Sequence, residues 1–183
     1  MTPLITDLPY VEVPEQQQLD STQQNGMHPE TELSETFVGL TRRLRVKYPI
    51  DKGVLIVREE EGDQLAAIST WHHGTVRDGL KLNLPADSSL FEKVAEDGRT
   101  YTEDFCGSFS GNFFERKLLL DDDSRCFVVQ PLKSEGRVLG LLGFSSHAES
   151  AFAMFEEGAL DSVADKFGEI IDRRLYKRHH ETE

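Results

Sequence analysis

Two apolar segments in the second half of the chain constrain the fold more than any other feature. Segments 126–132 and 138–144 are rich in valine, leucine and phenylalanine, and Ser134, Glu135 and Gly136 lie between them. Short apolar runs joined by a glycine-containing turn are typical of a β-hairpin. An antiparallel sheet is therefore the framework on which the rest of the chain has to pack.

Earlier and later segments supply the other parts of a layered fold. Segment 54–57 is a second short β-branched run, and the polar turn 59–63 connects it to another apolar run at 65–71, which predicts a second hairpin. Apolar side chains recur at helical spacing over 33–44 and again over 152–175. A helix before the first hairpin and a long amphipathic helix at the end of the chain are expected.

The segment between the hairpins is less regular. Residues 85–89 provide an N-cap for a short helix that Gly98 ends, and residues 100–103 form a brief extended run. Segment 105–123 is rich in glycine and aromatic residues, and 113–120 can form a short helix. Such a glycine-rich, aromatic stretch is typical of a functional loop region.

In this order the elements resemble a GAF domain. Residues 98–104 are similar to the family's segment of a glycine, a short strand and an acidic residue that enters the ligand lid. Segments 129–132 and 135–142 are similar to the family's paired strands, which end in proline-leucine and contain a glycine. The resemblance covers about Glu32 to Leu175.

The resemblance implies an α+β fold with a central, mainly antiparallel sheet of five or six strands. The N- and C-terminal helices are expected on one face of this sheet, and a lid of short helices and loops on the other. Residues 1–30 are proline- and glutamine-rich and form a polar arm, residues 31–178 the GAF-like domain, and residues 179–183 a tail.

Composition excludes several classes of partner. The net charge of -13 opposes contact with nucleic acid and anionic membrane surfaces. No run approaches the roughly 20 apolar residues of a membrane span, and the first residues lack a secretory signal, so a cytoplasmic protein is expected. The two cysteines, Cys106 and Cys126, have no CxxC spacing and are expected to be reduced thiols.

Members of the family bind cyclic nucleotides, bilins, haem, other metabolites or nothing, and one branch reduces free methionine sulfoxide. The cyclic-nucleotide signature has only a contiguous echo at 165–169, and Cys106 is followed by Gly107, whereas bilin attachment uses a Cys-His pair. The reductase branch uses three cysteines, and this chain has two. The cofactor, if there is one, is left unknown.

No Ser-His-Asp set, phosphate loop or catalytic carboxylate pair can be placed with the required context, so we do not expect an enzyme. The resemblance implies a non-catalytic, small-molecule-binding sensory or regulatory domain in signal transduction. A homodimer through the terminal helices is expected. Two alternatives remain: a dimerisation domain without a pocket, and a thiol-based redox sensor or enzyme similar to free methionine sulfoxide reductase.

The lid segment supplies the apolar walls and polar groups that a ligand pocket needs. Its two adjacent cations favour a small anionic ligand, which would lie under the lid and against the sheet. The candidate ligand-binding residues are Trp71, Phe105, Cys106, Phe109, Phe113, Phe114, Arg116, Lys117 and Arg125.

A metal site is not expected from the sequence. His72 and His73 are adjacent at the end of a strand, where successive side chains point to opposite faces, so both are not expected to bind one ion. The run Asp121-Asp122-Asp123 is more typical of a solvated loop than of a calcium site, because the EF-hand spacing is missing.

Overall fold

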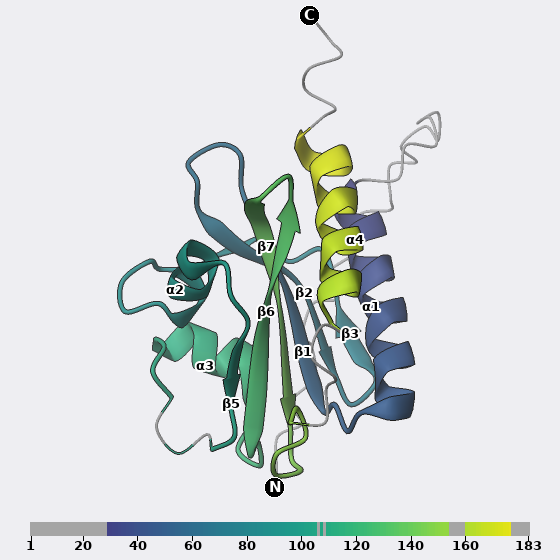
Figure 1. The fold of residues 1–183 in the computed structure, drawn as a ribbon, viewed down its shortest axis with the longest axis vertical. Coiled ribbons are helices and arrows are strands. Elements are labelled where there is room, and N and C mark those ends of the chain that lie inside the picture. The colour runs from purple at the N-terminus through teal and green to yellow at the C-terminus, as the bar shows by residue number, and fades with distance from the viewer. Residues whose placement is uncertain (1–28, 106, 108, 154–159, 177–183) are drawn as a thin grey trace, which may run out of the picture.

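A computed structural model describes residues 29–105, 107, 109–153 and 160–176, which form an α+β domain around one sheet (Figure 1). The elements in chain order are α1 (Pro29–Lys47), β1 (Lys52–Arg58), β2 (Leu65–His72), β3 (Thr75–Arg77), β4 (Leu82–Asn83), α2 (Leu90–Asp97), β5 (Tyr101–Glu103), α3 (Phe113–Leu119), β6 (Cys126–Ser134), β7 (Arg137–Ser146), α4 (Asp161–Ile171) and the π-helical turn η2 (Asp172–Tyr176).

The sheet is antiparallel throughout, as expected. Its strand order is β3-β2-β1-β7-β6-β5, and the short β4 pairs with β2 as a seventh strand. Both predicted hairpins are confirmed, as β1–β2 and β6–β7. Strand β1 lies between β2 and β7, with Leu55 opposite Leu142 on β7. The two hairpins therefore meet along β1 and β7.

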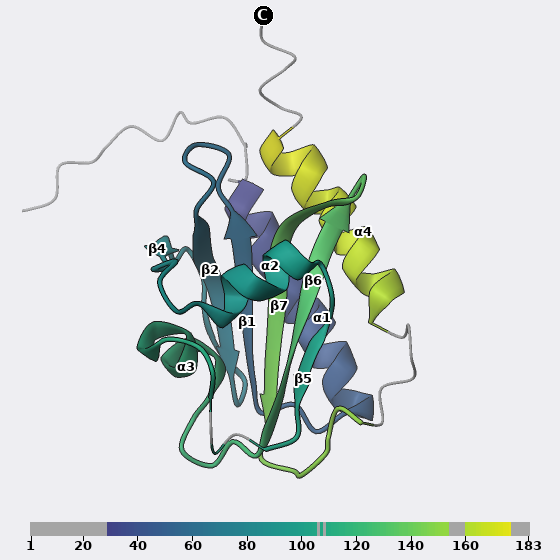
Figure 2. The same ribbon diagram turned by 60° about the vertical axis from the view of Figure 1, so that its left-hand side comes forward.

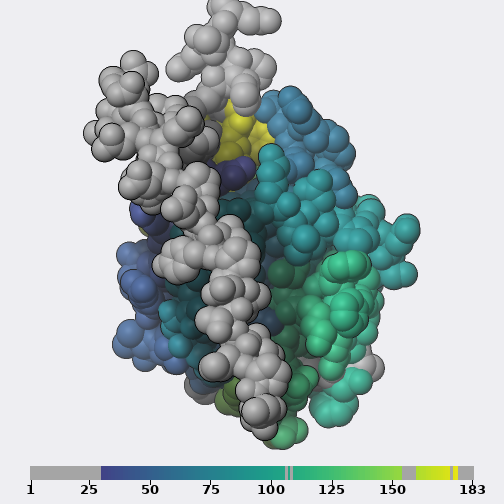
Figure 3. All heavy atoms as spheres, turned by 180° about the vertical axis from the view of Figure 1, so that it is seen from behind, coloured from purple at the N-terminus to yellow at the C-terminus, as the bar shows by residue number. Residues whose placement is uncertain are grey.

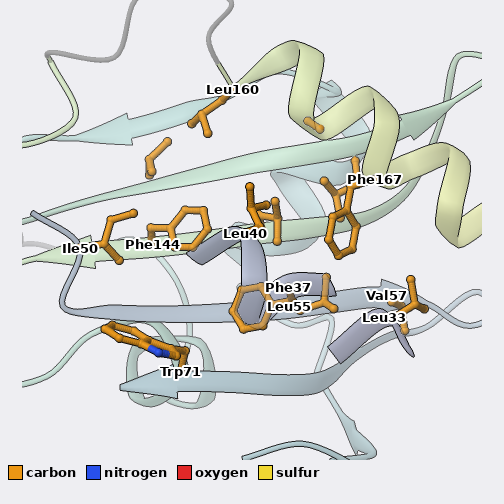
Figure 4. Packing of buried hydrophobic residues seen from close by; sticks show 14 of the residues in the cluster. Leu33, Phe37, Leu40, Ile50, Leu55, Val57, Trp71, Phe144, Leu160 and Phe167 are labelled. Carbon is orange, nitrogen blue, oxygen red and sulfur yellow. The ribbon is translucent and has the colours of Figure 1, made fainter. Parts of the chain in front are cut away.

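Helices α1 and α4 cover one face of the sheet (Figures 1 and 4). Their Phe37 and Phe167 belong to one buried cluster with Leu55 and Phe144 from the central strands. The Phe37 and Phe144 rings stack with their centroids 6.3 Å apart. The prediction that the terminal helices share a face is confirmed.

The C-terminal helix is shorter than the apolar spacing predicts. Phe152 lies in a turn, and α4 begins only at Asp161, with residues 154–159 outside the described part of the chain. Phe152 still joins the cluster under α4, so it is buried without being helical. The prediction of the helix length was too long because the helical spacing of apolar residues continues through a turn that is also buried.

Helices α2 and α3 form the layer on the opposite face, where the lid was predicted (Figure 2). A second apolar cluster joins Phe91 of α2 and Leu119 of α3 to Ile56 and Phe127 of the sheet. Seen from behind, the α1 layer and the α2–α3 layer lie on opposite sides of the molecule (Figure 3). Both faces of the sheet are therefore covered.

Capping residues fix the bounds of the two lid helices. Ser89 is the N-cap of α2, and Gly98 ends that helix in the left-handed conformation at φ 60°, both as the sequence predicts. Asn112 and Glu115 form a capping box at the start of α3. These local signals are strong because each satisfies a backbone group that the helix end leaves unpaired.

The predicted arm over 1–30 and the tail over 179–183 lie almost wholly outside the described residues, the first of which is Pro29 at the start of α1. Within the described residues, no helix has both the length and the apolar character needed to cross a bilayer.

Helix α4 contacts β6 so closely that one glycine is required. A Cβ placed on Gly168 would lie 1.9 Å from the carbonyl oxygen of Lys133, which is backbone and cannot rotate away. Gly39 in α1 has no atom within 4 Å of the same position, which makes it a matched control in another helix.

We expect Gly168→Ala to lower the free energy of unfolding by about 1–3 kcal/mol or more, because the helix has to move off the sheet. Gly39→Ala should raise it by about 0.5–1 kcal/mol, because alanine favours the helical conformation. Urea unfolding measures both, and a Gly168→Ala protein as stable as the wild type would contradict the predicted contact.

Candidate functional site

One buried carboxylate joins the two helices of the lid. Glu115 of α3 is fully buried and accepts a hydrogen bond from the hydroxyl of Ser89. Its oxygens also accept bonds from the backbone N–H groups of Leu90 at 2.9 Å, Phe91 at 2.8 Å and Asn112 at 2.9 Å. These donors include the first turn of α2, where the helix dipole favours negative charge. Glu115 therefore joins α3 to α2 and is saturated by internal partners.

The space between α3 and the sheet is filled by apolar side chains. Leu119 and Leu120 are buried in the cluster that contains Val54 and Phe127. A Cβ added to Gly143 of β7 would meet Leu119 at 2.8 Å and Val54 at 2.9 Å. The lid thus packs directly on the sheet at this point.

The predicted ligand-binding residues of the lid face solvent for the most part. Phe105, Phe113 and Phe114 are 70%, 66% and 48% exposed, and Arg116 and Lys117 are exposed beside them. The Lys117 ammonium lies 5.7 Å from the centre of the Phe113 ring. The side chains of Phe113, Phe114, Arg116 and Lys117 form an outer surface of α3, and Phe105 is exposed in the loop after β5.

Three further predicted residues do not come together at one place. Phe109 is half-buried and packs its ring 5.4 Å from that of Phe127 under the lid. Arg125 is exposed at the start of β6, where its backbone N–H bonds the carbonyl of Ser146. Cys106 lies outside the described residues. Ligand binding by this set stays a prediction.

Trp71 lies on the opposite face from the lid, which corrects the expectation that it lines the same cavity. It is buried in the cluster under α1, with the Arg45 guanidinium 4.7 Å from the ring centre. The reason is a β-bulge, because Leu55 pairs with Ser69 and Ile56 with Ala67, so Ile68 is skipped. The extra residue reverses the in-and-out alternation along the rest of β2.

The structure brings five titratable residues together at one end of the sheet. Asp51 precedes β1, His72 ends β2 and His73 follows it, Asp121 follows α3, and His147 follows β7. The imidazole Nε2 of His147 lies 2.9 Å from both carboxylate oxygens of Asp121, and that of His72 lies 3.1 Å from one of them. We call these five residues the histidine–aspartate cluster.

His72 and His73 face the same site, so the argument from strand alternation is wrong for this pair. His73 leaves the strand in a left-handed conformation at φ 46°, and its backbone N–H bonds the carbonyl of Asp51 at 3.1 Å. Its ring centre lies 4.5 Å from that of His72 and 5.3 Å from that of His147. A residue outside the strand geometry escapes the alternation of faces.

Hydrogen bonds control the charge state of the cluster. Burial opposes ionisation of Asp121, but hydrogen bonds from His147, Ser124 and His72 outweigh it and hold its pKa far below the ordinary value. Burial likewise opposes protonation of His147, but the hydrogen bond to Asp121 and the charges of Asp121, Asp51 and Asp123 raise its pKa above 6.5. An ionised Asp121 paired with a protonated His147 is thereby favoured.

Two overlapping sets within the cluster have ligand atoms close enough to share a metal ion. One set is Asp51, His73 and His147, and the other is His72, His73 and Asp121, with the ligand atoms of each set within 4.8 Å of one another.

A separate open groove lies at the other end of the sheet, next to η2. It encloses about 930 Å³ and is lined by carboxylates from several elements together with Arg58 and Arg137. Arg58 is paired with Asp63 at 3.1 Å and Glu92 at 3.2 Å. The excess of carboxylates makes this groove unsuitable for the small anionic ligand expected from the sequence.

Comparison of the fold with solved structures gives a consistent answer. The GAF domain of a phosphoenolpyruvate-protein phosphotransferase from Coxiella burnetii aligns with a TM-score of 0.63 at 20% identity, covering 85% of this chain and 89% of that one. The GAF domain of a sensor histidine kinase from Bacillus halodurans aligns with a TM-score of 0.62 at 15% identity, covering 76% and 92%. The chain has a GAF-like fold.

A third similar structure with this fold is an enzyme. The type II free methionine-R-sulfoxide reductase from Thermoplasma acidophilum aligns with a TM-score of 0.60 at 15% identity, covering 80% of this chain and 97% of that one. In sequence comparisons, no family model and no curated protein matches the chain. The GAF-like fold is therefore shown by structure, and an activity has to be argued from the site.

The sequence did contain a signal for the cluster, although spacing along the chain hides it. Asp51 and His147 are 96 residues apart, yet the backbone N–H of His147 bonds Asp51 at 2.8 Å. Because the sheet is antiparallel, the start of β1 and the ends of its neighbours β2 and β7 lie at the same end of the sheet. Polar residues at those three positions therefore meet in a GAF-like fold with this strand order.

We expect Asp121→Asn to lower the pKa of His147 toward 6.5, because the ionised partner that favours the imidazolium is lost. The raised pKa of His147 means that its stabilising contribution is present below pH 6.5 and is lost as the pH rises through the raised pKa. The lowered pKa of Asp121 means that its own contribution is present near neutral pH and is lost in strong acid. NMR titration of the His147 ring, with a chelator in the buffer, measures the shift.

The exposed neighbour Asp122 provides the control, because Asp122→Asn removes the same charge without the hydrogen bond. An unchanged His147 pKa in Asp121→Asn, or an equal decrease in Asp122→Asn, would contradict the predicted pairing.

Proposed function

We propose that this chain is a non-catalytic regulatory domain in signal transduction, which binds a small ligand at the histidine–aspartate cluster. The observation that carries the proposal is that Asp51, His73, Asp121 and His147, from four separate segments, come together at one end of the sheet. Their side chains are between 19% and 47% exposed, so they are both fixed in place and accessible. Convergent polar groups of this kind are typical of a binding site.

The contacts within the cluster favour binding over nucleophilic catalysis. Ser124 donates to Asp121 at 2.9 Å, and Asp121 in turn bonds His147. The carboxylate thus lies between the hydroxyl and the imidazole, whereas a Ser-His-Asp triad needs the imidazole between the other two. The serine is therefore not activated as a nucleophile.

Thiol chemistry is also disfavoured among the described residues. Cys126 is fully buried, and its thiol donates to the carbonyl of Ala148 at 3.1 Å. Burial raises the pKa of this thiol, so little of the reactive thiolate forms at neutral pH. This observation argues against the redox-sensor and reductase alternatives for Cys126.

A ligand at the cluster has a direct route to the lid. Asp121 lies two residues after the end of α3, and the Lys52 ammonium bonds the carbonyls of Lys117 at 2.6 Å and Leu120 at 2.9 Å at the same helix end. Asp121 also interacts electrostatically with Lys52. A ligand that replaces the present hydrogen-bond partners of Asp121 would therefore change the interactions at the C-terminal end of α3.

Thermal unfolding with a panel of nucleotides, organic anions, amines and divalent cations tests the binding site. At a concentration 100-fold above its Kd, a ligand stabilises the fold by about 2.7 kcal/mol, which corresponds to about 5–10 °C for a domain of this size. We expect one class of compound to produce such a shift in the wild type and in Asp122→Asn, but not in Asp51→Asn. A shift retained in Asp51→Asn, or no shift with any class, would contradict the proposed site.

We propose further that the domain forms a homodimer through its terminal helices. Helix α1 exposes Val46, which is 89% accessible although it is apolar. We expect the wild type to sediment as a dimer and Val46→Glu to sediment as a monomer with an unchanged circular dichroism spectrum, because Val46 is exposed and its replacement leaves the core intact. A monomeric wild type at micromolar concentration would contradict the dimer.

A further inference from the structure

We propose that the histidine–aspartate cluster binds one divalent transition-metal ion, with Asp51, His73 and His147 as its ligands. Asp121 acts as a positioning residue for His147. The inference rests on the proposed function, because it names the chemical class of the ligand that the cluster takes.

The three ligands already surround a common point. The Nδ1 of His73 lies 3.8 Å from one oxygen of Asp51, and the Nδ1 of His147 lies 4.0 Å from the other. Neighbouring ligand atoms around tetrahedral zinc are about 3.3 Å apart, because each lies about 2.0–2.1 Å from the ion. Each imidazole nitrogen therefore has to approach Asp51 by about 0.5–0.7 Å, and the ligand atoms of all three residues already lie within 4.8 Å of one another. Rotations of the two accessible histidine side chains supply movements of this size.

The two nitrogens of His147 have different partners, as a metal-binding histidine requires. Its Nε2 donates to Asp121 at 2.9 Å, which leaves Nδ1, on the side of Asp51, as the nitrogen with a free lone pair in the neutral ring. Metal-ligating histidines usually donate their other ring N–H to a carboxylate, which fixes the tautomer and the ring orientation. Asp121 is in the position of that carboxylate.

Asp51 is also oriented before any ion arrives. The backbone N–H of His147 bonds one of its oxygens, Oδ2, at 2.8 Å. The other oxygen, Oδ1, faces the ring of His73. His73 is held in turn by its backbone bond to the carbonyl of Asp51. Each of the three ligands is therefore positioned by a contact to another member of the cluster.

Two imidazoles and one carboxylate favour a first-row transition metal over calcium or magnesium, which prefer oxygen ligands. The side chains of His73 and His147 are 47% and 32% exposed, so solvent can take the remaining coordination position. The Lys52 ammonium interacts with Asp121 and opposes the ion, and the carboxylate of Asp121 offsets that repulsion.

Calorimetric titration of the chelator-treated full-length chain with zinc chloride tests the inference. We expect one zinc ion per chain, confirmed by native mass spectrometry. Asp51→Asn and His73→Asn should each weaken binding by at least about 10-fold, since each removes a ligand, and asparagine tolerates the left-handed conformation at position 73. Asp122→Asn, in the same loop as Asp121, should bind zinc as the wild type does.

Asp121→Asn should weaken zinc binding by about 10–100-fold, as the loss of an orienting carboxylate does. Cobalt absorption distinguishes this role from a general structural one. The visible spectrum should keep its band positions in Asp121→Asn, because the ligands are unchanged, and should shift in Asp51→Asn and His73→Asn. Thermal unfolding in chelator confirms that each variant is folded.

Three results would overturn the assignment: no zinc bound to the wild type, wild-type zinc affinity in Asp51→Asn or His73→Asn, or a greater loss of affinity in His72→Asn than in Asp51→Asn. The last would place the ion in the alternative set of His72, His73 and Asp121. If zinc fails but another compound stabilises the wild type and not Asp51→Asn, the metal assignment falls and the proposed function stands. If neither zinc nor any other compound stabilises the wild type, the metal assignment and the proposed function are both wrong.

Discussion

Burial of β1 on both faces is the constraint on which the rest of the structure depends. Five consecutive residues of this strand are buried, and the last four of them, 54–57, alternate between the cluster under α2 and α3 and the cluster under α1 and α4. Two apolar layers are required to cover such a strand, and burying an unpaired charged group in either layer would be costly. The polar residues available for binding are therefore concentrated at the strand ends, where the histidine–aspartate cluster lies.

The exception to this division is Glu115, a carboxylate buried within the lid layer. It is tolerated because four hydrogen bonds satisfy it and the N-terminus of α2 provides a favourable dipole. The same bonds hold α3 at its N-terminal end, while Lys52 holds its C-terminal carbonyls. The lid is thus attached by polar contacts at both ends, and one of them adjoins the cluster. The proposed site is therefore connected to helix α3 of the lid through contacts at the C-terminal end of that helix.

The sequence predicted the elements whose signals are local. The two hairpins, the Ser89 cap and the Gly98 stop follow from turn and capping chemistry within a few residues. It did not predict the β-bulge at Ile68, which moves Trp71 to the other face, because the bulge is a property of pairing with β1. It also missed the site, because the left-handed backbone of His73 and the distant His147 become visible only when strand order and register are known.

The most direct test of the account is the location of a bound ion. Crystals of the chelator-treated protein, soaked in zinc and measured on both sides of the zinc absorption edge, give an anomalous difference map that identifies the metal and its ligands. We predict one strong peak within coordination distance of Asp51, His73 and His147, with Asp121 still bonded to Nε2 of His147. A map whose only zinc peaks lie elsewhere, such as beside the exposed lid residues or in the acidic groove, would contradict it.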